Sequence, residues 1–194
     1  METNFRNLNF HPNTTIKTKL SKQLFPILFL SLTSAHADTF GTGSDQFDMD
    51  FVDIGDAGNA ADTTGDPNPA GSVGYHYRMG VNEVSRGTID SYNALSSGPT
   101  LTMSDMTSFG GNGADRPATG VSWNEAARFV NWLNTSKGFS VAYKFAGTGA
   151  NDNIALWQPG DTGYDAANPF RNRNAQYFLP SEDEWYKAAY YDPA

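Results

Sequence analysis

The sequence predicts an α+β domain in which short strands and helices are separated by long irregular segments. Two segments, 47–51 and 75–81, alternate apolar and polar residues with the period of half-buried strands. Two later segments, 122–133 and 181–189, begin with capping signals and continue with helical spacing. Nineteen glycines and ten prolines among 194 residues make the chain turn-rich, but less so than a disordered chain.

The composition limits the chemistry that this chain can perform. A length of 194 residues suits one sizeable domain, and 13% aromatic residues favour a packed core. A formal net charge of −8 disfavours nucleic acid and anionic lipid as partners. The sequence has no cysteine, which excludes disulfides, thiolate zinc sites, iron–sulfur clusters and cysteine nucleophiles. Three histidines leave little room for a histidine-built metal or triad site.

Residues 1–37 have the features of a secretory signal peptide. Three lysines, at positions 17, 19 and 22, precede the mostly apolar run 24–32, and Ala35-His36-Ala37 forms a small-x-small cleavage pattern. The run is too short to span a bilayer comfortably, so we do not expect an integral membrane span in the mature chain. We expect cleavage after Ala37 and a secreted or periplasmic protein that begins at Asp38.

Residues 38–74 form an acidic entry segment that contains one predicted strand. Phe47, Met49 and Phe51 alternate with Asp48 and Asp50, and the remainder from Gly55 onward has the composition of a loop. Carboxylates suit calcium, so a calcium site is one interpretation of Asp48, Asp50 and Asp53. These residues do not fit the spacing of an EF-hand loop, and a solvated acidic loop is the favoured interpretation.

The next predicted strand covers residues 74–85. One face would carry Tyr75, Tyr77, Met79 and Val81, and His76 would lie on the polar face. A short helix is expected after Ser85, although Gly87 weakens it. Residues 97–117 have the composition of a loop.

The clearest helix start is at Ser122, with Glu125 completing a capping box. Helical spacing then predicts one buried stripe, formed by Ala126, Phe129, Val130 and Leu133, and Gly138 is the expected stop. A strand-like piece at 141–145 precedes a long polar loop up to residue 176. Calcium is again an alternative to simple solvation for the polar residues of that loop, Asn151, Asp152, Asn153, Asp161 and Asp165.

The same capping device recurs at Ser181 and Glu184. The spacing of Trp185, Ala188 and Ala189 predicts the face through which this last helix packs. Three adjacent carboxylates, residues 182–184, suit the positive end of a helix, and capping explains them without any catalytic role.

Three blocks in order, YRMGVNEVSRGTIDSYN, RPATGVSWNEAARFVNWLN and YFLPSEDEWYKAAYY, resemble the formylglycine-generating enzyme, or sulfatase-modifying factor, family. The positions that match the motifs of that family are Met79, Gly80, Glu83, Val84, Pro117, Val121, Ser122, Trp123, Leu133, Leu179, Pro180, Glu182, Glu184, Trp185, Ala188 and Ala189. The resemblance implies a fold related to C-type lectins. It also implies a chemistry, because well-known members oxidise a sulfatase cysteine to formylglycine with oxygen and a copper ion held by two cysteines. Other relatives are associated with nonheme-iron enzymes or bind ligands.

Two departures bear on function. No cysteine is available for copper, and the chain ends at residues 191–194, where the family normally continues with further blocks. We therefore expect residues 75–194 to be the N-terminal part of such a domain, incomplete at its C-terminus. No catalytic, cofactor-binding or metal residue of the family can be transferred to this chain, and copper or calcium is expected only in a full-length member.

Three interpretations remain open from the sequence. The first is an exported member of the family whose full-length form has an enzymatic or enzyme-assisting role, with a protein or peptide as the substrate, while the present chain is truncated and not catalytic as it stands. Alternatively it is a non-catalytic lectin-like module that binds a ligand or partner. The third possibility is a nonfunctional truncation product.

Overall fold

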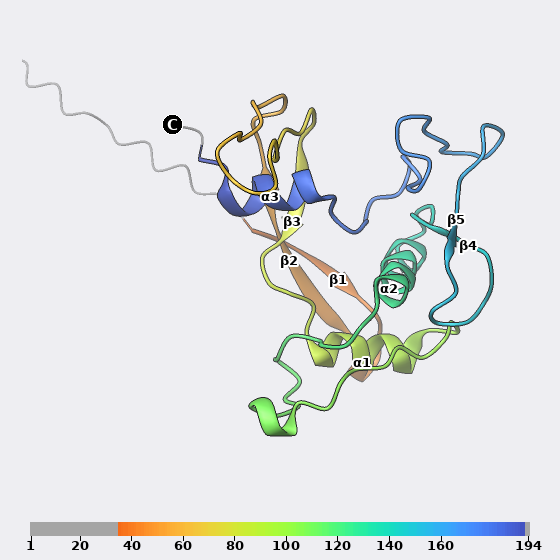
Figure 1. Ribbon diagram of the computed structural model, residues 1–194. Coiled ribbons are helices and arrows are strands. Elements are labelled where there is room, and N and C mark those ends of the chain that lie inside the picture. Colours follow the sequence, from red (N-terminus) through yellow and green to blue (C-terminus); the bar gives the residue numbers. More distant parts are fainter. Residues whose placement is uncertain (1–34, 193–194) are drawn as a thin grey trace, which may run out of the picture. The chain divides into compact units, whose positions relative to one another are not determined.

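The computed structural model describes residues 35–192, all of which belong to one compact unit. Its main sheet has three antiparallel strands in the order β1 (His36–Phe40), β2 (Phe47–Ile54) and β3 (Tyr77–Gly80). In the register of the sheet, Asp38 lies opposite Met49, and Val52 lies opposite Met79. Helix α1 lies near one end of this sheet and helix α3 near the other (Figure 1).

Strand β1 was not anticipated from the sequence. It begins two residues before the expected cleavage site, and most of the expected signal segment, residues 1–34, lies outside the described residues. A short 3₁₀ turn, η1 (Gly43–Asp45), connects β1 to β2. Phe40 is 1% exposed and stacks on Phe47, so β1 contributes an aromatic ring to the core.

The predicted helices are confirmed, and their caps explain where they begin. Helix α1 (Arg86–Leu95) starts after Ser85, whose hydroxyl accepts from the backbone N–H of Thr88. Helix α2 (Trp123–Ser136) has the expected capping box between Ser122 and Glu125, and the chain turns away at Gly138 with a φ of 77°. Helix α3 (Glu182–Tyr190) has the second capping box.

Two expected strands are shorter than predicted. The alternating segment 74–85 forms a strand only at Tyr77–Gly80, and Tyr75 and Val81 at its ends are 46% and 49% exposed. Of the strand-like piece 141–145, only β4 (Lys144–Phe145) is extended, and it pairs with β5 (Ile154–Ala155). The loop 97–117 is irregular as expected, apart from the short turn η2 (Thr107–Phe109).

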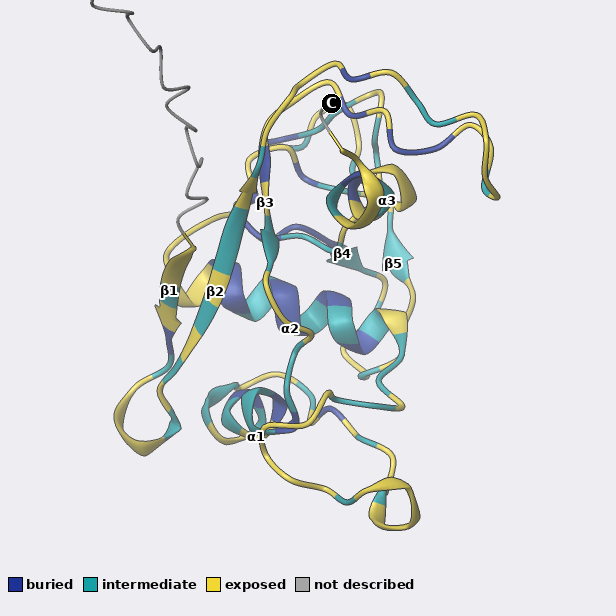
Figure 2. Cartoon of the chain, turned by 90° about the vertical axis from the view of Figure 1, so that its left-hand side faces the viewer, coloured by how far each residue is buried: buried dark blue, intermediate teal, exposed yellow. Residues whose placement is uncertain are grey.

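The core lies where α1 and α2 meet the sheet, and Figure 2 shows buried residues concentrated along these helices. The stripe predicted for α2 is largely confirmed, since Phe129, Val130 and Leu133 are buried, although Ala126 is only half-buried. Asn134 is fully buried next to this stripe. Its side-chain N–H groups donate to the backbone carbonyls of Val130 and Tyr177, and its side-chain oxygen accepts from the backbone N–H groups of Gln176 and Tyr177. These hydrogen bonds fix the loop before α3 against α2.

Candidate functional site

A large open cavity lies between β3, α2, α3 and the loop 165–180. Its volume is about 1010 Å³. One side is polar and contains Arg171 and Glu184, whereas the other is apolar and reaches core side chains such as Phe129 and Leu133. Cavities of this size and mixed lining are typical of ligand-binding sites.

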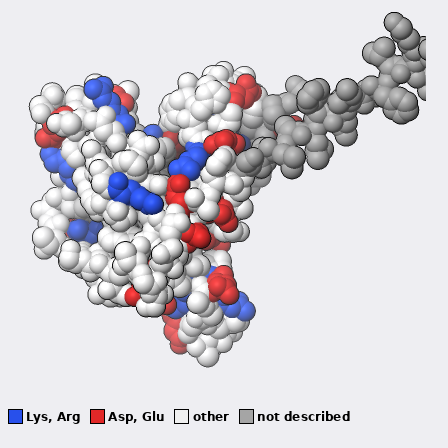
Figure 3. Space-filling model, turned by 180° about the vertical axis from the view of Figure 1, so that it is seen from behind, with Lys and Arg blue, Asp and Glu red and all other residues white. Residues whose placement is uncertain are grey.

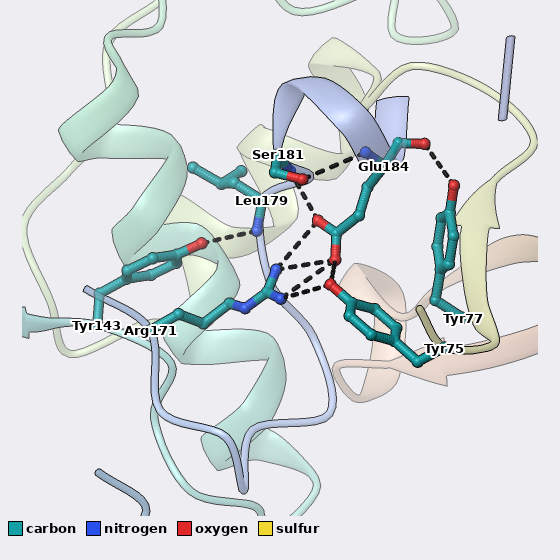
Figure 4. A network of polar contacts seen from close by, with 7 residues as sticks. All are labelled: Tyr75, Tyr77, Tyr143, Arg171, Leu179, Ser181 and Glu184. Atoms are coloured by element: carbon teal, nitrogen blue, oxygen red, sulfur yellow. Dashed lines mark hydrogen bonds and ion pairs between the residues drawn. The ribbon is translucent and has the colours of Figure 1, made fainter. Parts of the chain in front are cut away.

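Glu184 is the centre of the polar wall (Figure 4). Both of its carboxylate oxygens accept from the Arg171 guanidinium at 3.1 Å, and the hydroxyl of Tyr75 also donates to it. The backbone N–H of Ser181 donates to the same carboxylate at 2.7 Å, which is half of the capping box. The Glu184 side chain is 1% exposed and that of Arg171 is 18% exposed. Glu184 therefore joins three segments that are far apart in the sequence.

The ionisation of this wall follows from its contacts. Burial by itself raises the pKa of Glu184, but hydrogen bonds from Arg171, Tyr75 and Ser181 outweigh it and hold the pKa below its ordinary value. Burial and the charge of Glu184 raise the pKa of Tyr77 to about 12. The polar wall around Glu184 thus consists of a carboxylate, a guanidinium and phenol groups whose pKa values are raised.

Side chains on and next to α3 form hydrogen bonds with the acidic loop 56–71. Asp183 accepts from the backbone N–H of Gly71, and Tyr186 on the same helix donates to Asp62. The hydroxyl of Tyr191 donates to the carboxylate of Asp56, and the Lys187 ammonium donates to the backbone carbonyl of the same residue at 2.8 Å. The acidic loop was expected to be merely solvated. It instead holds α3 in place.

The packing face predicted for α3 is wrong. Trp185 is 52% exposed and Ala189 is also exposed, whereas Glu184 and Lys187 are the buried residues of this helix. The polar partners on the 56–71 loop and at Arg171 rotate the helix so that its charged side faces inward. Trp185, Ala188 and Ala189 consequently line the open cavity rather than a closed interface.

Within residues 35–192, the side chains that were considered as calcium ligands do not cluster. Asp48, Asp50 and Asp53 point outward from β2 as exposed residues. In the later loop, Asp161 is bonded to Lys144 at 2.6 Å, and Asp152 accepts from the N–H of Gly149. Over residues 35–192, no three carboxylate or imidazole side chains come together in a manner that could hold a metal.

The face drawn in Figure 3 carries side chains of both signs, and neither sign forms a continuous field on it. No helix within residues 35–192 is long and apolar enough to cross a membrane.

His76 is exposed on the polar side of its segment, as expected. Asn134-Thr135-Ser136 has the sequence of a glycosylation sequon, but the Asn134 side chain is 0% exposed and fully hydrogen-bonded in the folded chain.

Comparison with known families identifies the domain. A model of the sulfatase-modifying factor enzyme 1-like domain matches residues 55–191, which is more than half of the chain. The chain belongs to this family. No curated protein and no solved structure matches it significantly. The match confirms the resemblance, and the matched residues include both capping boxes and all of the cavity lining except Met49 and Phe51.

Sequence reasoning missed several residues of the cavity wall. Arg171 lies in a segment that has the composition of a loop, and Tyr75 was assigned only to a strand face. Both contact Glu184, although Arg171 is 13 residues and Tyr75 is 109 residues away from it in the sequence. The one local signal was an arginine close to a helix start that carries three carboxylates.

Proposed function

We propose that this chain is an exported binding module of the sulfatase-modifying factor family that holds a polypeptide partner in the cavity beside β3. The observation that supports this proposal is the opening of the apolar core into a cavity of about 1010 Å³. Apolar side chains that are exposed at this cavity, such as Val81 at 49% and Trp185 at 52%, are stabilised when a partner covers them. The C-type-lectin-like architecture implied by the family is part of this proposal, since such folds present binding surfaces on irregular loops.

The copper chemistry of the family is not supported by the residues of this chain. Copper(I) is selected by soft thiolate ligands, and the 194 residues contain none. The three histidines lie at positions 11, 36 and 76, and among residues 35–192 the cavity lining contains one of them, His76. A binding role is therefore favoured over formylglycine formation.

Export is proposed on the features of residues 1–37. Cleavage after Ala37 would remove the first two residues of β1 but retain Asp38 and Phe40. Asp38 accepts from Arg78 at 2.6 Å and from Tyr177 at 2.9 Å. A mature chain that begins at Asp38 would keep the side-chain bonds that fasten β1 to the rest of the sheet.

Binding at the cavity can be tested with an apolar peptide probe and two variants. The probe is a fluorescein-labelled heptapeptide, Ser-Val-Thr-Phe-Thr-Val-Ser, and the measurement is fluorescence anisotropy. Val81→Glu places a charge at the cavity rim, where Val81 is 49% exposed, and should abolish binding. Phe109→Ser changes a residue that is 76% exposed outside the cavity, and should leave binding unchanged. Equal binding by both variants and the parent chain would contradict the proposal.

A further inference from the structure

The outer edge of β3 has backbone groups that the sheet does not use. The N–H of Val81 donates to the carbonyl of Asp50 at 2.9 Å, so Val81 and Asp50 form a hydrogen-bonded position of the β2–β3 ladder. Bonded pairs alternate along an antiparallel ladder, which places Val52 opposite Met79 as the next bonded pair. The backbone groups of Arg78 and Gly80 therefore point away from β2. No described residue outside the sheet bonds to them.

This free edge borders the cavity, because Arg78 and Gly80 are among its lining residues. Water can satisfy the exposed groups, but a polypeptide in extended conformation satisfies them while also covering the apolar wall. A small molecule would not match a row of alternating donors and acceptors. The edge therefore favours a peptide backbone as the occupant.

The charges around the cavity indicate the kind of side chains that fit. Six charged side chains line it, three of each sign: Arg78, Arg171, Arg173, Glu83, Asp165 and Glu184. Two of the arginines are already paired, Arg78 with Asp38 and Arg171 with Glu184. A lining without net charge, in a chain whose net charge is −8, suits a segment that is itself uncharged.

We propose that an extended, uncharged polypeptide segment adds to the outer edge of β3 as a fourth strand, with large apolar side chains at alternate positions turned into the cavity. This inference rests on the proposed binding function and specifies its mode. Strand β3 has four residues, which at about 3.4 Å per residue corresponds to a paired length of about 14 Å. A segment of about five residues is thus sufficient.

Backbone methylation of the probe tests this mode separately from binding itself. The heptapeptide Ser-Val-Thr-Phe-Thr-Val-Ser is compared with two versions that carry N-methyl groups on alternate amides, one version for each phase. A strand pairs through only one phase, so one version should bind about tenfold more weakly and the other about as well as the parent peptide. Val81→Glu should weaken all three, and Phe109→Ser none.

The outcomes separate the two proposals. If both methylated peptides bind like the parent peptide and Val81→Glu still abolishes binding, strand addition is wrong and the binding function stands. If none of the peptides binds, both proposals fail. Sedimentation velocity of the chain alone completes the test: a dimer that Val81→Glu dissociates would identify a second copy as the occupant and overturn the assignment to a separate segment.

Discussion

Replacing Glu184 with glutamine tests whether the polar wall of the cavity organises the domain. Glutamine keeps the size of the side chain and can still complete the capping box with Ser181, so the change isolates the charge. Removing one partner of a buried pair costs about 3–5 kcal/mol, because the other charge is left uncompensated. Arg171 retains 18% exposure of its side chain, and water relieves part of this cost. We expect the free energy of unfolding to fall by about 2–3 kcal/mol.

The assay is equilibrium unfolding in urea, followed by circular dichroism at neutral pH. Glu182→Gln is the matched control, since Glu182 lies in the same first turn but is exposed and forms no ion pair among the described residues. It should cost at most about 0.5 kcal/mol through the helix dipole. Equal stabilities of the two variants would refute the assigned role of Glu184.

The pH dependence of stability gives a second measure of the same contact. The pKa of Glu184 is lowered in the folded chain, from an ordinary value of 4.5. The group therefore contributes stability that is fully present above pH 4.5 and is lost as the pH falls through the lower folded value. The difference in unfolding free energy between the parent chain and Glu184→Gln should shrink over that acidic range. A difference that stays constant down to the acid limit would indicate that the carboxylate charge is not responsible.

Four further predictions concern other contacts of the domain, its chemistry and its export. Asp38→Asn should weaken the attachment of β1 through Arg78 and Tyr177, and the stability that it removes should already be absent in the parent chain at acidic pH, because the pKa of Asp38 is lowered. Asn134→Ala should lower the unfolding free energy by about 3 kcal/mol, since it leaves buried backbone groups unpaired, while Thr135→Ala on the exposed side of α2 should change it little. A peptide with a sulfatase-type cysteine motif should keep its mass after incubation with the chain, oxygen and copper; a protein-dependent mass change to formylglycine would contradict the binding role. Protein recovered from a secreting host should begin at Asp38 by N-terminal sequencing, and recovery from the cytosol with an intact N-terminus would contradict export.

The helices could be predicted because their signals are local. Ser122 and Glu125 lie three residues apart, as do Ser181 and Glu184, and the hydrogen bonds that start each helix form within one turn. The wall of the cavity could not be predicted in this way. Arg171 and Tyr75 contact Glu184 only after the loops fold, and no periodic pattern in the sequence predicts these contacts. The orientation of α3 was missed for the same reason, since its polar partners lie on the distant 56–71 loop.

Strand β1 illustrates a second limit of sequence reasoning. His36 and Ala37 were assigned to the cleavage pattern of a signal peptide, and β1, which begins at His36, was therefore not predicted. The strand is identified by its neighbours instead, because Asp38 bonds Arg78 on β3 and Phe40 packs against Tyr177. Both contacts join residues at least 40 positions apart in the sequence, so only tertiary structure reveals them.

The binding role of the cavity is tested most directly by the indole N–H signals of the four tryptophans in a nuclear magnetic resonance titration. Trp185 lines the cavity, whereas Trp123, Trp132 and Trp157 do not. Adding the unmethylated heptapeptide should shift the Trp185 signal in a saturable manner and leave the other three in place. Shifts at the other tryptophans without a shift at Trp185, or no shift at any of them, would contradict binding at this cavity.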